Sequence, residues 1–248
     1  SVYRIKTYEI PESSRTARGT AIINLLQLDG NEKVTAAIPV KEYKEGTYLL
    51  MVTKEGIIKK TSIMEYQNIR KGGLNAIHLR EEDELIQVKN IEGDESIFVG
   101  TRNGQGIVFS VKDVRAIGRT GMGVKAMNLN RGDEVIGAGL SSEGRDILFV
   151  TSKGLGKRTD IKEFNIQKRG GKGVKTYRLA EKTGTIIGIK MVSEDEEILL
   201  ITSEGIIIRM HASQISKTGR VTQGVKLMNL ENEESVVSVA KVIEEEEE

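Results

Sequence analysis

The sequence contains no Cys and no Trp, and it has only two Pro residues. The absence of Cys excludes disulfides, thiolate metal ligands and cysteine nucleophiles, and it fits a reducing compartment. No apolar run approaches the ~20 residues that a membrane-spanning helix needs, and the N-terminus lacks the pattern of a signal peptide. We therefore expect a cytoplasmic protein that has no contact with a membrane.

Aromatic residues make up only 4% of the chain, and its apolar residues are mainly Ile, Val, Leu and Met. Small branched side chains pack well on pleated strands, whereas ligand pockets are usually lined by larger apolar and aromatic groups. The 27 Gly residues suit a fold with many tight turns. This composition favours β-structure over a small-molecule site.

The net charge of +1 conceals an uneven distribution. Residues 231–248 hold eight Glu and one Lys, so they carry −7 while residues 1–230 carry +8. Five of those Glu form a run at 244–248, which we expect to be an acidic tail. A basic body of this kind indicates a polyanionic partner.

Two sequence patterns recur at intervals of about fifty residues. The first is an apolar run followed by Thr-x-x-Gly, ending at Gly56, Gly104, Gly154 and Gly205. The second is a Gly followed six residues later by Leu, at Gly19, Gly73, Gly123, Gly173 and Gly224. Each unit reads as four short strands separated by Gly-containing turns.

These repeats predict a single all-β domain over residues 1–243, built of four-stranded blades arranged radially. We expect a strand at 2–10, full repeats over 19–215 and a half-repeat at 224–243. No stretch shows a sustained helical period, and only single helical turns are expected, for example at 62–66 and 212–215.

Basic residues hold fixed positions relative to the second Gly. An Arg lies four residues before it in four units (Arg15, Arg119, Arg169 and Arg220), and Arg70 lies three before it in the fifth. Lys125, Lys175 and Lys226 follow it by two residues. In a radial array, one sequence offset corresponds to one height on one edge, so we expect a ring of cations that contacts phosphates.

Further basic residues lie near the same corner or follow the Thr-x-x-Gly turn. The first group is Arg18, Lys71, Lys168, Lys172 and Lys217, and the second is Lys59, Lys60, Lys157, Arg158 and Arg209. The densest corner is Gln167-Lys168-Arg169-Gly170-Gly171-Lys172-Gly173. We expect Arg169 to donate hydrogen bonds to phosphate oxygens there, while the glycines let backbone N–H groups approach the phosphate. The segment is not a Walker A loop, because no Gly-Lys-Ser/Thr follows.

Residues 167–173 match at every position the box heptapeptide of bacterial DNA gyrase A subunits. Four further stretches are also similar to that family: residues 3–19, 23–26, 154–159 and 219–225. In the family the box lies in the first blade, whereas here it lies in a later one. The chain thus resembles the C-terminal domain of these subunits of a type IIA topoisomerase.

The resemblance implies a β-pinwheel, a propeller-like disc of five to six blades that exchange strands. It also implies a monomeric domain that binds, bends and wraps double-stranded DNA without sequence preference and supports ATP-dependent negative supercoiling. The implied partners are the gyrase B subunit, together with the N-terminal part of the gyrase A subunit.

We expect the domain itself to be non-catalytic, with no cofactor and no metal. The two His residues, His78 and His211, occupy different points of the repeat, and no nucleophile–base arrangement emerges. Two alternatives stay open: the matching domain of a topoisomerase IV subunit, whose box is degraded, and a propeller that is a scaffold for proteins.

Overall fold

The Thr-x-x-Gly segments are the turns of four antiparallel β-hairpins in the computed structural model, which describes residues 1–14, 16–28, 32–231 and 233–242. The hairpins are β1 (Thr47–Thr53) with β2 (Ile57–Ser62), β4 (Ser96–Thr101) with β5 (Gln105–Ser110), β8 (Asp146–Thr151) with β9 (Leu155–Asp160), and β12 (Glu197–Thr202) with β13 (Ile207–His211). The Thr hydroxyl stabilises the turn, as where Thr53 Oγ1 accepts the N–H of Ile57 at 3.2 Å.

A third strand from the same repeat pairs antiparallel with the first strand of each hairpin. These strands are β3 (Leu85–Glu92), β7 (Val135–Leu140), β11 (Ile186–Val192) and β15 (Val236–Lys241). The two hairpin strands and this third strand come from one repeat, and they are neighbours in the sheet.

The fourth strand of a sheet comes from the following repeat. Short strands β6 (Val124–Lys125), β10 (Val174–Lys175) and β14 (Val225–Lys226) pair with β2, β5 and β9. The resulting orders are β3-β1-β2-β6, β10-β5-β4-β7, β11-β8-β9-β14 and β13-β12-β15. The prediction of an all-β fold with four-stranded blades and exchanged strands is confirmed.

The Gly that precedes each exchanged strand is required by backbone geometry. Gly123, Gly173 and Gly224 have φ values of +99°, +72° and +71°. A Cβ on Gly123 would lie 2.6 Å from the carbonyl oxygen of Ile58, and Cβ atoms on the other two would collide with the backbone of Gly106 and Gly156. Only Gly allows both the positive φ and this close approach, so the repeat Gly marks where the chain crosses into the preceding sheet.

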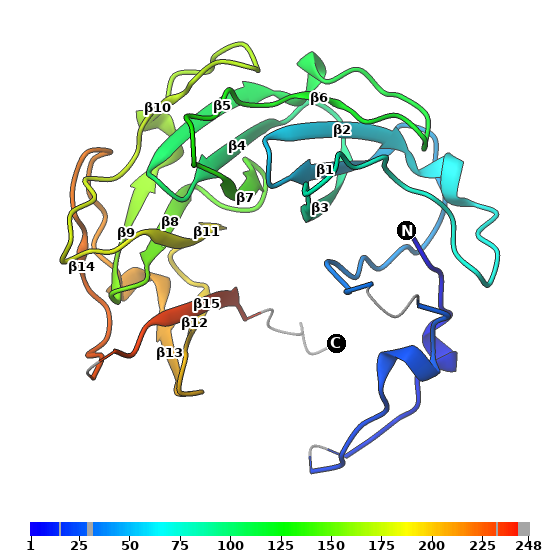
Figure 1. Cartoon of the computed structure of the whole chain (residues 1–248), viewed down its shortest axis with the longest axis horizontal. Helices are drawn as coiled ribbons and strands as arrows, with labels where there is room; N and C mark the ends of the chain where they lie inside the picture. Colours follow the sequence, from blue (N-terminus) through cyan, green and yellow to red (C-terminus); the bar gives the residue numbers. More distant parts are fainter. Residues whose placement is uncertain (15, 29–31, 232, 243–248) are drawn as a thin grey trace.

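The four sheets follow one another along an open arc (Figure 1), in which β3, β7, β11 and β15 form the inner side. The exchanged strands β6, β10 and β14 lie on the outer side. The core fills the spaces between and within sheets, with clusters such as that of Phe98, Phe149 and Tyr177, whose rings meet edge to face. The inner strands also line a cavity of about 290 Å³.

Single 3₁₀ turns join the elements. Six occur in the described residues: η1 (Thr7–Glu9), η2 (Ile22–Asn24), η3 (Ile63–Tyr66), η4 (Val111–Asp113), η5 (Ile161–Glu163) and η6 (Ala212–Gln214). The turns expected at 62–66 and 212–215 are confirmed.

Two expected strands near the N-terminus do not form. Within residues 2–10 only Val2 makes a β-bridge, to Leu74, and η1 follows it. After Gly19 the chain enters η2 instead of an exchanged strand. A strand forms only against a partner, and no described strand flanks either segment beyond this bridge. The Val2–Leu74 bridge nevertheless has the same position as the exchanged strands, directly after Gly73.

Candidate nucleic-acid interface

The exchanged strands define an outer edge, by which we mean β6, β10 and β14 together with the three edge turns at 115–123, 165–173 and 216–224 that lead into them. Lys125, Lys175 and Lys226 are the second residues of these strands and are exposed. They pair in register with Ile57, Gln105 and Leu155. The same position on three successive sheets therefore presents one ammonium group each.

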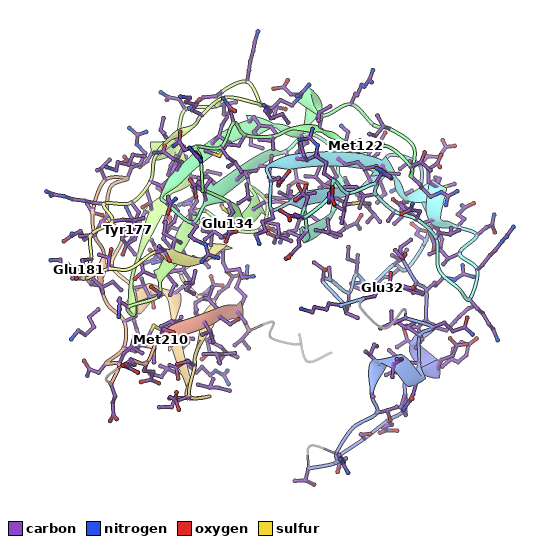
Figure 2. All side chains as sticks on the ribbon, viewed as in Figure 1. Glu32, Met122, Glu134, Tyr177, Glu181 and Met210 are labelled. Carbon is purple, nitrogen blue, oxygen red and sulfur yellow. The ribbon has the colours of Figure 1, made fainter. Side chains whose placement is uncertain are left out.

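Figure 2 shows long nitrogen-tipped side chains projecting from the outer side of the arc, where Met122 lies, whereas Glu134 lies nearer the inner side. Lys168, Lys172, Arg70, Lys71 and Arg18 are exposed as well. Within the described part of the chain, these five residues and the three strand lysines make no ion pair with a carboxylate. Their charges are available to a polyanion. Arg15 lies outside the described residues.

Three of the Arg residues at the fixed offset, Arg119, Arg169 and Arg220, are half-buried, and each contacts the preceding repeat. Arg169 donates from Nε to the backbone carbonyl oxygen of Asp113 at 2.9 Å and from Nη1 to the backbone carbonyl oxygen of Lys125 at 3.1 Å. The Arg220 guanidinium carbon lies 5.9 Å from the centre of the Phe164 ring. Arg119 Nε lies 3.7 Å from a carboxylate oxygen of Glu65. These side chains fix the edge turns in addition to presenting charge there.

Three of the predicted DNA-binding residues are interior, and their prediction is corrected. Lys59, Lys157 and Arg158 are 1%, 0% and 3% exposed. Arg158 donates to Asp146 at 2.7 Å and to the carbonyl of Ile215 at 2.9 Å, forming a buried ion pair. Alternation along a strand sends one of two neighbouring side chains inward, and here the covering edge turns bury both in β9.

Three further predicted residues are already paired. Lys217 Nζ lies 2.7 Å from Asp146 and 3.0 Å from Asp160, and the hydrogen bond to Asp146 is the main cause of its raised pKa. Lys60 donates to the carbonyl of Val111 at 3.0 Å. Arg209 forms an ion pair with Glu197 at the solvent-exposed surface.

The glycines of residues 167–173 are partly committed to contacts with the neighbouring sheet, which the expectation of a phosphate nest did not include. The N–H of Gly170 donates to the carbonyl of Ala126 at 2.7 Å, and the carbonyl of Gly171 accepts the N–H of Asn128 at 2.8 Å. Gly173 is committed to the strand crossing. The N–H of Gln167 donates to Val108 at 2.8 Å. The segment therefore presents the exposed side chains of Lys168 and Lys172 to a ligand, and part of its backbone binds the neighbouring sheet.

Sequence reasoning missed two exposed cations of the outer edge, Arg115 and Arg178. Arg178 lies five residues after Gly173 and stands beside the next edge turn, because its N–H donates to the carbonyl of Thr222 at 3.0 Å. The same offset carries the exposed residues His78 and Asn128 in the preceding repeats, which is a signal that the sequence contained.

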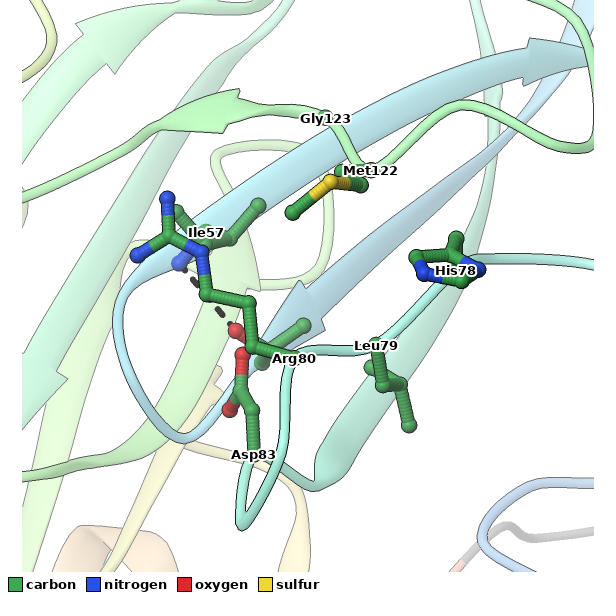
Figure 3. A pocket seen from close by; sticks show the side chains of 8 residues that line it. Ile57, His78, Leu79, Arg80, Asp83, Met122 and Gly123 are labelled. Carbon is green, nitrogen blue, oxygen red and sulfur yellow. Dashed lines mark hydrogen bonds between the residues drawn. The ribbon is translucent and has the colours of Figure 1, made fainter.

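His78 borders a cavity of about 200 Å³ next to β2, which Arg80, Asp83 and Met122 also line (Figure 3). Asp83 accepts the N–H groups of Glu55 and Glu84, so its carboxylate is a turn cap. His211 is exposed near Glu197. Among the described residues no group of three or more His, Asp and Glu could hold a metal ion, and no helix there is long and apolar enough to span a membrane.

A protein-family model described as the DNA gyrase C-terminal domain, beta-propeller, matches residues 1–41, 47–92, 95–142, 145–193 and 196–243. The first match covers a segment in whose described residues no sheet forms, and each of the other four covers the hairpin and the third strand of one sheet. The model therefore divides the chain into five repeats where the structure describes four sheets.

Curated relatives include the DNA gyrase A subunit of Clostridium acetobutylicum, which is 45% identical over 97% of this chain and 29% of that protein. The same subunit from Ureaplasma parvum is 42% identical over 96% of this chain and 28% of its own length. The chain thus spans less than a third of the relatives that it matches.

Solved structures with the same fold include the C-terminal domain of DNA topoisomerase IV, at a TM-score of 0.87 and 28% identity over 95% of this chain and 74% of that one. A DNA gyrase A C-terminal domain matches at a TM-score of 0.83 and 28% identity, over 97% of this chain and 78% of that one. With the family model covering all five repeats, the chain belongs to the DNA gyrase A C-terminal domain family.

Proposed function

We propose that this domain binds duplex DNA along its outer edge without sequence preference and bends it around the arc. The observation that carries the proposal is the placement of Lys125, Lys175 and Lys226 at one register position of three successive sheets, with no carboxylate partner among the described residues. Phosphate contacts of this kind position DNA but do not read its sequence.

The binding surface in this proposal differs from the set expected from the sequence. It comprises the exposed residues Arg18, Arg70, Lys71, Lys125, Lys168, Lys172, Lys175 and Lys226, together with Arg115 and Arg178. Arg119, Arg169 and Arg220 contribute the parts of their guanidinium groups that face outward. Lys59, Lys157 and Arg158 are left out, because their head groups are occupied inside the protein. Lys60, Lys217 and Arg209 are left out because they already have partners within the protein.

We further propose that the domain is non-catalytic and monomeric and serves a gyrase, an ATP-dependent type IIA topoisomerase of the bacterial cytoplasm. That complex also contains the B subunit, together with the N-terminal part of the A subunit. Within it, bending DNA gives strand passage its direction and yields negative supercoils. The named relatives are gyrase A subunits, which favours this parent over topoisomerase IV.

A protein-binding role is the second candidate, and one observation favours it. In the described structure β13 is the outer strand of a sheet without an exchanged strand, and Ile206 and Ile207 beside its open edge are 52% and 60% exposed. An edge of this kind can pair with a strand of another chain.

Binding of a random-sequence duplex, followed by gel shift at two or more salt concentrations, separates the two candidates. Neutralisation of about five phosphates gives a log–log slope near −4.5. A slope shallower than about −2, equivalent to fewer than about three phosphates, contradicts DNA binding along the outer edge.

A further inference from the structure

Two lysine ammonium groups lie inside the domain, directly beneath edge turns. Lys157 Nζ donates to the carbonyl oxygen of Gly219 at 2.8 Å and also to that of Arg220. Lys59 Nζ donates to the carbonyl oxygen of Ala76 at 2.6 Å and also to that of Arg119. In both cases the buried lysine of one sheet holds the backbone of an Arg that lies four residues before the next repeat Gly.

Neither ammonium forms an ion pair with a described carboxylate. The Lys157 group is instead flanked by aromatic rings, with Nζ 5.7 Å from the centre of Phe149 and 5.1 Å from that of Tyr177. Burying an unpaired cation is costly, so a residue of this kind is retained only where its hydrogen bonds offset much of the cost.

The sheet between these two provides an internal comparison. The position of Lys59 in β2 and Lys157 in β9 is occupied in β5 by Ile107, which is fully buried. There the edge turn is fixed by the Arg169 guanidinium, which donates hydrogen bonds to two backbone carbonyl oxygens of the preceding repeat. An apolar side chain at this position is therefore compatible with the fold, and a Lys is not needed to build the strand.

We propose that Lys59 and Lys157 are positioning residues that set the edge turns of Arg119 and Arg220 for contact with DNA. The inference rests on the DNA-binding function proposed above and concerns how its surface is held. Each ammonium donates hydrogen bonds to carbonyl oxygens of the turn, so these carbonyls point into the domain. The orientation of the peptide planes is then fixed, and the Arg side chain of the turn is directed toward the outer edge.

The charge of these groups makes the arrangement sensitive to pH. Burial lowers the pKa of both ammonium groups to about 8, and for Lys59 the neighbouring Arg119 adds to the shift while Glu65 opposes it. The other titratable groups that face them are the phenols of Tyr66 and Tyr177, whose pKa values are raised by burial. Between pH 7 and pH 9, Lys59 and Lys157 lose their charge while the phenols stay neutral.

The test is a double-mutant cycle on the whole domain with Lys157→Met, Arg220→Gln and the two combined, using a random-sequence duplex as the probe. Lys33→Met is the matched control, because Lys33 is exposed and lies two residues before Thr35, which lines the cavity on the inner side of the arc. We expect each single change at 157 or 220 to reduce the steepness of the salt slope by about 1 and the double change to reduce it no further. The control leaves the slope unchanged.

Two more readouts accompany the cycle. DNA affinity of the unchanged domain falls from pH 7 to pH 9, and this fall is reduced in Lys59→Met/Lys157→Met. In the absence of DNA, amide hydrogen exchange at 216–224 is faster in Lys157→Met and unchanged in the control.

Additive losses in the cycle would overturn the proposal, because Lys157 would then act independently of Arg220. Unchanged exchange at 216–224 would overturn it as well, whatever the affinities. Failure of the unchanged domain to bind DNA would instead refute the proposed function, and the exchange experiment would still decide whether Lys157 holds the turn.

Discussion

Gly173 passes over the carbonyl oxygen of Gly106 so closely that a Cβ on residue 173 would collide with it. This contact is the crossing point at which β10 leaves its own repeat and joins β5 of the preceding sheet. Because every exchanged strand begins with such a crossing, the contact links the sequence repeat to the position of the basic residues on the outer edge.

Gly173→Ala is expected to destabilise the domain by more than the ordinary cost of placing Ala at positive φ, which is about 1–2 kcal/mol. The collision with Gly106 adds to that cost. Gly170→Ala is the matched control: Gly170 has φ +81°, but its nearest neighbour to a Cβ is 3.7 Å away. Urea denaturation measures both, and equal losses would show that the crossing is not tightly packed.

Arg158 is expected to stabilise the fold rather than bind DNA. Arg158→Ala leaves the buried Asp146 without this partner and should cost about 3–5 kcal/mol. Arg209 occupies the same register position in β13 but is exposed, and Arg209→Ala should cost at most about 1 kcal/mol. Thermal or urea unfolding compares the two variants. Similar small losses would mean that Arg158 is not committed to the interior.

The pKa of about 8 for Lys59 and Lys157 predicts how stability changes with pH. Their folded pKa lies below the ordinary 10.5, so the unfolded chain binds more protons between these values. Stability relative to Lys59→Met/Lys157→Met should therefore rise with pH above about 8. Urea midpoints at pH 7.5, 8.5 and 9.5 measure the difference. A difference that stays constant over this range would contradict the burial of the two charges.

The fold was predictable because its signals are local and repeated. Thr-x-x-Gly marks each hairpin turn, and the second Gly marks each strand crossing. The roles of the lysines after Thr-x-x-Gly were not readable in the same way. Lys59 and Lys60 are neighbours on one strand, and the pattern of charge does not tell which side chain an edge turn will cover. The one available clue was Ile107, an apolar residue at the same offset as Lys59 and Lys157.

The packing role of the glycines of residues 167–173 was missed for a related reason. A flexible, basic, Gly-rich turn suits phosphate binding as well as it suits close packing of two backbones, and composition cannot separate the two. The hydrogen bond from Gly170 to Ala126 and the crossing at Gly173 are long-range contacts that appear only once neighbouring repeats are placed side by side.

The exposed strand lysines are expected to account for much of the salt dependence of binding. Changing Lys125, Lys175 and Lys226 together to Gln should make the log–log slope shallower by roughly 2.7, since each phosphate contact contributes about 0.9. Lys33, Lys41 and Lys44 form the charge-matched triple control, because they are exposed in the segment before β1, whose Thr35 and Ala36 line the cavity on the inner side of the arc. Equal effects of the two triple changes would mean that overall charge, and not the outer edge, governs binding.

The central claim is that DNA follows the curved outer edge, and energy transfer between dyes at the two ends of a random-sequence duplex tests it most directly. Bending a site of roughly 20–30 bp by about 40–90° costs on the order of 1–6 kcal/mol. Several charge-assisted contacts of about 1.5–3 kcal/mol each can offset this cost. The account predicts that transfer increases at saturating protein and returns toward the free value with the Lys125, Lys175 and Lys226 changes. Tight binding with unchanged transfer would show that the duplex stays straight, and it would contradict the account.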